Sequence, residues 1–239
     1  MKFEIPENSN FGFSGDSPAD MKDPSDEYTI TDIAIDVSPS TGLVRDNMCK
    51  GMQTVVEACK QNPRAEKLMI RLSAFGSRIE EIHGFKPVND IDPNDYQPLA
   101  SIGGSTCLYD AIYNSVSAVS RYSEILDKSD IGSNGIVFCF TDGMDNSSSL
   151  GAQSILDKLN EIRMKEILES IKIVIIGFGG SDVKSYLDKL TNDLGLDQFV
   201  NVDSMSAKEA AKVFGFVSQS ISAQSQHLGT GGPSQNLTF

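Results

Sequence analysis

Apolar residues recur along the chain in two alternating patterns, short continuous runs and longer stretches with helical spacing. Nearly continuous runs of Ile, Val, Leu and Phe suit strands that are buried on both faces of a sheet. Such runs occupy residues 33–37, 68–75, 136–140 and 171–178, followed by a shorter one at 199–202. We therefore predict a buried sheet whose strands are widely separated in the sequence.

Between these runs, apolar residues three and four positions apart place an apolar stripe along one face of a helix. The predicted helices cover residues 44–59, 108–119, 155–168, 183–194 and 210–221. Regular alternation of strands and helices indicates right-handed βαβ units. The expected fold class is therefore α/β, with a Rossmann-like doubly wound, mostly parallel sheet and helices on both faces.

One segment breaks the alternation. Residues 78–85 follow Phe75 after only Gly76 and Ser77, a connection too short for a parallel crossover. We expect this segment to form an antiparallel edge strand reached by a hairpin, which brings the predicted sheet to six strands.

The two ends of the chain lack both patterns. Residues 1–26 are rich in Pro, Ser, Asp, Asn and Gly and predict a polar N-terminal arm. Residues 226–239 are polar and Gly-rich and predict a flexible C-terminal tail. The folded domain is expected to cover residues 27–225.

Composition and charge argue against some classes of binding partner for this protein. The chain has 239 residues, 39% hydrophobic and 22% charged, as is typical of one large α/β domain. A net charge of −13 without a concentrated basic patch argues against binding to nucleic acid or to an anionic membrane surface. No apolar run reaches the roughly 18 residues of a membrane span, and the start of the sequence lacks the features of a secretory signal. We expect a cytoplasmic protein.

The cysteines predict no redox or nucleophilic chemistry. Cys49, Cys59, Cys107 and Cys139 are far apart and form no Cys-x-x-Cys pair, which indicates reduced thiols in the core. Cys107 lies near a predicted helix start, but no histidine is placed to activate it. His83 is expected at the surface without a partner.

Oxygen-bearing side chains follow three of the predicted strands. Asp36, Ser38 and Ser40 come directly after the first strand, Thr106 ends a Gly-Gly-Ser-Thr turn, and Asp142 lies in a Thr-Asp-Gly turn. Each loop alone also fits a helix cap or a tight turn. Together, at the strand ends where ligands collect in such sheets, they offer two carboxylates and several hydroxyls. This donor set suits a hard cation, Mg²⁺, Ca²⁺ or Mn²⁺, better than zinc or copper.

The three loops together resemble a known motif. The order Asp-x-Ser-x-Ser, Gly-Gly-Ser-Thr-Cys-Leu-Tyr-Asp-Ala and Phe-Thr-Asp-Gly is similar to the metal-ion-dependent adhesion site (MIDAS) of von Willebrand factor type A (vWA) domains. The resemblance covers about residues 28–222 and implies the fold of that family. Residues 213–222 are also similar to the last helix of short cytosolic bacterial members linked with tellurium-resistance-type gene clusters.

The resemblance assigns roles to five residues. It implies hydroxyl ligands from Ser38, Ser40 and Thr106, with Asp36 and Asp142 acting directly or through coordinated water. It also implies that an Asp or Glu of a partner protein completes the coordination shell of the ion, which is most readily Mg²⁺.

Two positions depart from the family pattern or add to it. Pro39 stands where family members usually have Gly, which removes a backbone N–H from the metal loop and leaves the metal affinity in question. Asp145 follows the Thr-Asp-Gly turn and offers either a further carboxylate or a solvated turn residue.

Three functions remain open at this point. We favour an adaptor without enzymatic activity that uses a bound cation to capture an acidic residue of a partner protein. A Mg²⁺-dependent phosphotransferase or phosphatase also places an Asp after its first strand, but its acid/base carboxylate would stand where this chain has Ser38. The third alternative is a metal-free scaffold with the same fold.

Overall fold

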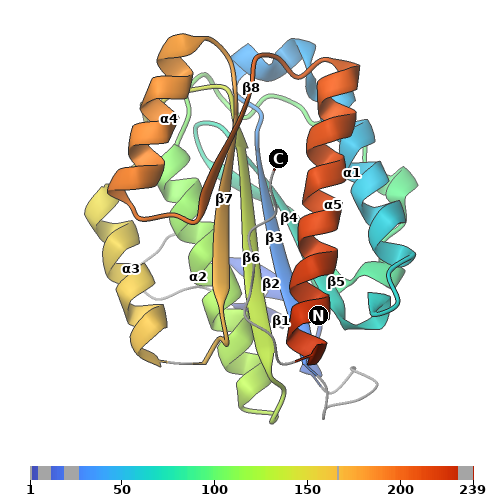
Figure 1. The fold of residues 1–239 in the computed structure, drawn as a ribbon. Helices are drawn as coiled ribbons and strands as arrows, with labels where there is room; N and C mark the ends of the chain where they lie inside the picture. The colour runs from blue at the N-terminus through green and yellow to red at the C-terminus, as the bar shows by residue number, and fades with distance from the viewer. Residues whose placement is uncertain (1, 5–11, 19–26, 166, 231–238) are drawn as a thin grey trace.

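The described residues form one eight-stranded sheet with helices packed on both faces (Figure 1). The computed structural model describes residues 2–4, 12–18, 27–165, 167–230 and 239. The strands are β1 (Lys2–Glu4), β2 (Phe13–Gly15), β3 (Tyr28–Asp36), β4 (Leu68–Phe75), β5 (Ile79–Pro87), β6 (Ser133–Thr141), β7 (Ile171–Phe178) and β8 (Gln198–Val202). Their order across the sheet is β1-β2-β5-β4-β3-β6-β7-β8.

Five α-helices in the described part cover the sheet. They are α1 (Arg45–Lys60), α2 (Leu108–Asp127), α3 (Ala152–Lys165), α4 (Ser181–Asp193) and α5 (Ala207–Thr230). Helices α1 and α5 pack on one face and α2, α3 and α4 on the other, each layer with its own hydrophobic core (Figure 1). None of these helices has the length and apolar character of a membrane span.

Strand β3 lies at the centre, parallel to β4 on one side and to β6 on the other. Its residues alternate between the two cores. Ile33 and Ile35 pack under α1 and α5, whereas Ile30 and Ala34 pack on the opposite face. Burial on both faces explains the continuous apolar run, and it confirms the predicted α/β class with a mostly parallel sheet.

The antiparallel strand is not at the edge, and the sheet has eight strands instead of the predicted six. Strand β5 pairs antiparallel with β4 after the turn at Gly76 and Ser77, as predicted. Its other side is covered by β2, where Gly15 pairs with Phe85, and β1 pairs with β2 in turn. The predicted arm, residues 1–26, therefore contributes two strands to the sheet.

Close backbone approach and one buried ring explain why β2 packs on β5. A Cβ at Gly84 would lie 2.2 Å from the carbonyl oxygen of Ser14, so a larger residue there would force the strands apart. Phe13 is fully buried, and its ring meets that of Phe85 edge to face with centroids 6.0 Å apart. The backbone N–H of Ser14 donates to Glu81 at 3.0 Å, and its hydroxyl donates to the same carboxylate.

The predicted tail, residues 226–239, begins inside a helix, because α5 runs to Thr230. The Phe239 ring packs edge to face on Phe216 with centroids 5.6 Å apart, and Lys212 Nζ lies 4.5 Å from the Phe239 ring centroid. The residues between Thr230 and Phe239 lie outside the described part. The described positions of this segment thus belong to the folded domain.

A buried ion network joins the strands on the α2 side of the sheet. Arg71 of β4 is fully buried, and its guanidinium pairs with Asp32 of β3 and, at 2.7 Å, with Glu81 of β5. Arg71 Nη2 also donates to Asn114 Oδ1 of α2 at 3.0 Å. Since Glu81 accepts hydrogen bonds from Ser14, the network extends to β2.

Replacing Arg71 should destabilise the domain strongly. The variant Arg71→Ala leaves Asp32 and Glu81 without their cation, and loss of one partner of a buried pair costs about 3–5 kcal/mol. We expect that decrease in the free energy of unfolding, measured by urea denaturation. The control Arg78→Ala breaks an exposed pair with Glu80 and should cost less than about 1 kcal/mol. Equal, small losses in both variants would contradict a structural role for the network.

His83 of β5 has a partner, contrary to the expectation from the sequence. Its ring is half-buried and stacks on Tyr96 with centroids 5.7 Å apart. Nδ1 lies 2.9 Å from the carbonyl oxygen of Gly84, which can only accept, so Nδ1 carries the proton and Nε2 accepts from the Tyr96 hydroxyl at 2.7 Å. Burial lowers the pKa of His83 to about 4.

Acid should therefore destabilise the fold through this residue. Because the folded pKa of His83 lies below its ordinary value, its contribution to stability is complete above about pH 6.5 and declines as pH falls toward about 4. We expect the decrease in Tm between about pH 7 and about pH 4.5 to be smaller in His83→Gln than in the wild type. An equal decrease in both proteins would assign the acid sensitivity to other groups.

Candidate metal centre

Asp36 is the last residue of β3, at the edge of the sheet where the neighbouring parallel strands β4 and β6 also end. This edge is at the top of Figure 1. The Asp36 side chain is fully buried. Oδ1 accepts from the backbone N–H of Ser38 at 2.8 Å, and Oδ2 accepts from the hydroxyl of Thr141 at 2.7 Å. The carboxylate is thereby held between the loop after β3 and the end of β6.

A chain of hydrogen bonds leads from this loop to the loop after β6. The hydroxyl oxygens of Ser38 and Ser40 lie 3.0 Å apart, and Ser40 Oγ donates to Asp142 Oδ1 at 2.8 Å. A serine hydroxyl that donates its proton to a carboxylate keeps its lone pairs for a cation. Asp36, Ser38, Ser40 and Asp142, which were predicted from two separate loops, are thus joined in one network.

Thr106 lies beside the same network. A Cβ at Gly143 would be 3.6 Å from Thr106 Oγ1 and 4.0 Å from Asp36 Oδ2, so both oxygens border one small space that glycine leaves open. Only 5% of Thr106 is exposed. Among the described residues, its hydroxyl has no hydrogen-bond partner. All five residues predicted as ligands therefore gather at one edge of the sheet.

The loop after β6 is anchored by residues to which the sequence assigned no role. Asn146 Oδ1 accepts from the N–H of Thr106 at 2.8 Å, and the N–H of Asn146 donates to the Thr106 carbonyl at 3.0 Å. Asp110, in the first turn of α2, accepts from the N–H groups of Ser149 and Leu150 at 2.9 and 2.8 Å. These contacts fix Thr106 relative to Asp142. The sequence places Asp110 near the start of a predicted helix, but it does not indicate the loop residues that donate hydrogen bonds to it.

Arg45, the first residue of α1, binds the loop after β3 through several hydrogen bonds. Its Nη2 donates to the carbonyl oxygens of Val37 and Ser38, both at 2.9 Å. Its Nε donates to the hydroxyl of Thr41 at 3.3 Å. The positive charge also acts on Asp36, where it opposes the effect of burial on the pKa of the carboxyl group.

Pro39 and Asp145 both have a place in these loops. Pro39 is the first residue of a short 3-10 helix (Pro39–Leu43), a position where no backbone N–H is required. The N–H that meets the Asp36 carboxylate comes from Ser38. Asp145 Oδ1 accepts from the N–H of Tyr109 at 3.3 Å and from the hydroxyl of Ser148, so that oxygen is engaged within the loop region.

The two carboxylates are costly to ionise where they lie. Burial raises the pKa of Asp36, although hydrogen bonds from Ser38 and Thr141 oppose the shift. Burial also raises the pKa of Asp142; the hydrogen bond from Ser40 opposes this shift, and the nearby charge of Asp36 adds to it. A bound cation would favour the ionised form of both groups.

The chemistry of the donor set fits a hard cation. It consists of two carboxylates and three hydroxyls, without nitrogen or sulfur. No group of three or more His, Cys, Asp or Glu side chains suited to a metal ion occurs in the described part of the chain. The neighbouring Cys107 offers no thiolate, because burial raises its pKa to about 12. The site accordingly depends on hydroxyl oxygens as much as on carboxylates.

Solved structures with the same strand and helix arrangement identify the fold. The PilB minor pilin from Streptococcus sanguinis superposes with a TM-score of 0.57 and 13% identity, over 86% of this chain and 63% of the pilin. The pilus adhesin SpaC from Lactobacillus rhamnosus GG superposes with a TM-score of 0.58 and 11% identity, over 82% of this chain and 30% of the adhesin. The fold is that of the vWA domains.

A third solved structure shares this vWA fold. It is proximal thread matrix protein 1 from the mussel byssus, described with a zinc-occupied MIDAS motif, with a TM-score of 0.54 and 19% identity over 82% of this chain and 46% of that protein. The present chain spans less than two thirds of each of these three proteins. No family model and no curated protein matches the sequence.

Removing the Thr106 hydroxyl should weaken metal binding without affecting the fold. Thr106 Oγ1 makes no hydrogen bond among the described residues, so Thr106→Ala should leave Tm unchanged while Mg²⁺ affinity, measured by calorimetry, falls at least about tenfold. Ser105→Ala is the matched control, because the Ser105 hydroxyl donates to Ser77 at 2.9 Å instead. Unchanged Mg²⁺ affinity in Thr106→Ala would exclude the Thr106 hydroxyl as a ligand. A wild-type protein that binds no Mg²⁺ would argue for the metal-free scaffold.

Proposed function

We propose that this chain is a protein-interaction module that holds one divalent cation, Mg²⁺ by preference over Ca²⁺ or Mn²⁺, and uses it to grip an Asp or Glu of a partner protein. The observation that carries the proposal is the convergence of five oxygen-bearing side chains from three loops. Asp36 and Ser38 are buried beneath the site, whereas Ser40 is exposed. The donors therefore approach a cation from the protein side and leave its outer side to a ligand from solution.

The charge of the donor set favours an acidic ligand. Two carboxylates balance the charge of a divalent ion, while neutral hydroxyls leave it electrophilic toward a further anionic oxygen. When bound, the cation would supply electrostatic attraction for a carboxylate. Two carboxylates of this chain would hold the cation. Asp36 is oriented by hydrogen bonds from Ser38 and Thr141, and Asp142 is oriented by a hydrogen bond from Ser40.

Exposed apolar side chains beside the site support a role in protein binding. Four large apolar residues of the described part are well exposed, and two of them follow the ligand loops. Leu43 is 98% exposed three residues after Ser40, and Met144 is 40% exposed two residues after Asp142. Exposed apolar side chains around a charged anchor are typical of a binding surface. The partner segment is therefore expected to carry apolar residues next to its acidic residue.

We propose that the chain has no catalytic activity. A phosphotransferase of the kind considered above needs a second carboxylate two residues after Asp36, and that position holds Ser38, whose hydroxyl contacts Ser40. The vWA-fold protein with a zinc-occupied MIDAS motif supports a cation at this edge of the fold.

The proposal is tested with a synthetic peptide that has one Asp between two Leu residues. By NMR titration, the peptide should bind the full chain with Mg²⁺ present and not with EDTA, and the matching Asn peptide should bind at least about tenfold more weakly. Leu43→Ser and Met144→Ser should weaken peptide binding and leave Mg²⁺ affinity unchanged.

Two results would overturn this proposal. Peptide binding that is the same in Mg²⁺ and in EDTA would remove the cation from the mechanism. Mg²⁺-dependent hydrolysis of p-nitrophenyl phosphate that is lost in Asp36→Asn would replace the adaptor with a phosphotransferase.

A further inference from the structure

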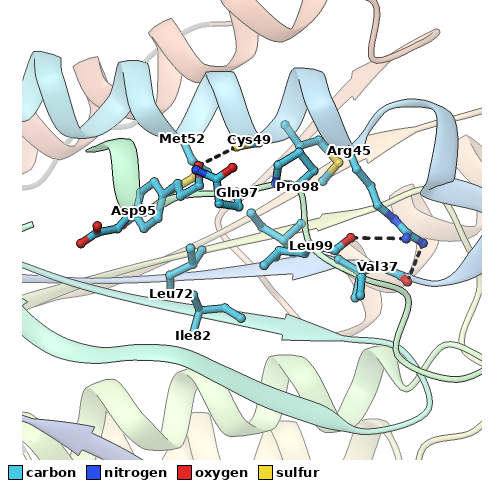
Figure 2. A pocket seen from close by; sticks show the side chains of 14 residues that line it. Val37, Arg45, Cys49, Met52, Leu72, Ile82, Asp95, Gln97, Pro98 and Leu99 are labelled. Carbon is cyan, nitrogen blue, oxygen red and sulfur yellow. Dashed lines mark hydrogen bonds between the residues drawn. The ribbon is translucent and has the colours of Figure 1, made fainter. Parts of the chain in front are cut away.

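A cavity of about 200 Å³ lies on the α1 side of the sheet, close to the metal loop (Figure 2). It is bounded by α1, by the end of β3, by the middle parts of β4 and β5, and by the segment 95–100. Its floor is apolar and buried, formed by Ile35, Val37, Met48, Met52 and Leu72. Its rim includes Ile82, which is 39% exposed, so the cavity opens to solvent.

The cavity exists because the segment 95–100 is attached to α1 through its carbonyl groups. The carbonyl oxygen of Tyr96 accepts from the Cys49 thiol at 3.2 Å and from Gln53 Nε2 at 3.1 Å. The carbonyl oxygen of Leu99 accepts from Arg45 Nη1 at 3.3 Å. Contacts at both ends carry the segment across the space between α1 and β5, and the apolar floor below it stays accessible.

Arg45 brings a positive charge to one end of this apolar space. Each of its hydrogen bonds goes to an uncharged oxygen, of Val37, Ser38, Thr41 or Leu99. Among the described residues, no carboxylate pairs with its guanidinium. A guanidinium beside apolar surface binds a carboxylate more strongly than it binds a carbonyl. The long contact with Leu99 is the one that a carboxylate would most easily replace.

We propose that this pocket binds a small, apolar monocarboxylic acid, with the apolar body in the cavity and the carboxylate on Arg45. The volume exceeds that of a cavity of about 150 Å³ that holds benzene, so it suits one ring or a short alkyl chain. A single negative charge is indicated because Arg45 is the one cationic residue in the lining. Asp95 lies at the opposite end, exposed at the rim (Figure 2), and disfavours a second negative charge there.

Octanoate is the probe, and the full chain is titrated by NMR in the presence of EDTA, so that the result does not depend on the metal centre. Binding should be saturable at the residues that line the cavity. Affinity should increase by about fourfold for each methylene from butyrate to octanoate, as expected for burial of the chain. Octanol has the same chain without the charge and should bind at least about tenfold more weakly than octanoate.

Two variants and one control separate the contributions of charge and cavity. Arg45→Met should reduce octanoate affinity to about that of octanol. Ala100→Phe adds a ring at an exposed position of the rim and should block the cavity, whereas Ala211→Phe, at an exposed position of α5 outside this lining, should not. Because Arg45 also supports the metal loop, Ala100→Phe is the variant that decides.

Two results would overturn the proposal. One is octanol binding as tight as octanoate binding in the wild type. The other is Ala100→Phe with unchanged octanoate affinity.

Discussion

The parallel pairing of β3 with both β4 and β6 is the constraint on which the site depends. It brings Asp36 and Thr141 to the same edge of the sheet, close enough for the 2.7 Å hydrogen bond between them. Side chains alternate between the faces of a strand, so a shift of register by one residue would turn Asp36 to the opposite face. The apolar residues of β3 are buried in both cores and prevent such a shift. Core packing therefore determines the position of polar groups at the rim.

Two acids on the same face of β3 meet different electrostatic surroundings. Asp32 is neutralised inside the protein by the fixed guanidinium of Arg71. Asp36, four residues further on, accepts hydrogen bonds from neutral donors, while the nearby Arg45 binds carbonyl oxygens of the loop and not the carboxylate. Both side chains are fully buried, but the protein supplies a paired cation of its own only for Asp32 of these two. Burial raises the pKa of both carboxyl groups, but Asp36 makes no ion pair among the described residues, and its counter-charge is the one that we propose a cation from solution supplies.

Much of the fold could be predicted because its signals are local. Strands β4 and β7 begin and end where the continuous apolar runs do. The loops that carry Ser38 and Asp142 follow β3 and β6, which also contain such runs. Strand β2 could not be predicted in this way, since its three residues are stabilised by Phe85 and Glu81, which lie far away in the chain. The bond between Asn146 and Thr106 is equally non-local. The structure brings the five predicted ligands together, but their roles in coordination stay predictions.

The covering of β5 by β2 has a consequence for how the molecule avoids self-association. A long strand at the side of a sheet presents unpaired peptide groups that can template pairing with another copy. Here β2 pairs with β5 at Phe85, and among the described residues the outermost strand on that side is β1, with three residues. A domain boundary drawn at residue 27 from the polar composition of the preceding segment would discard this shield. This polar segment thus covers part of the side of β5 that would otherwise be open to pairing with another copy.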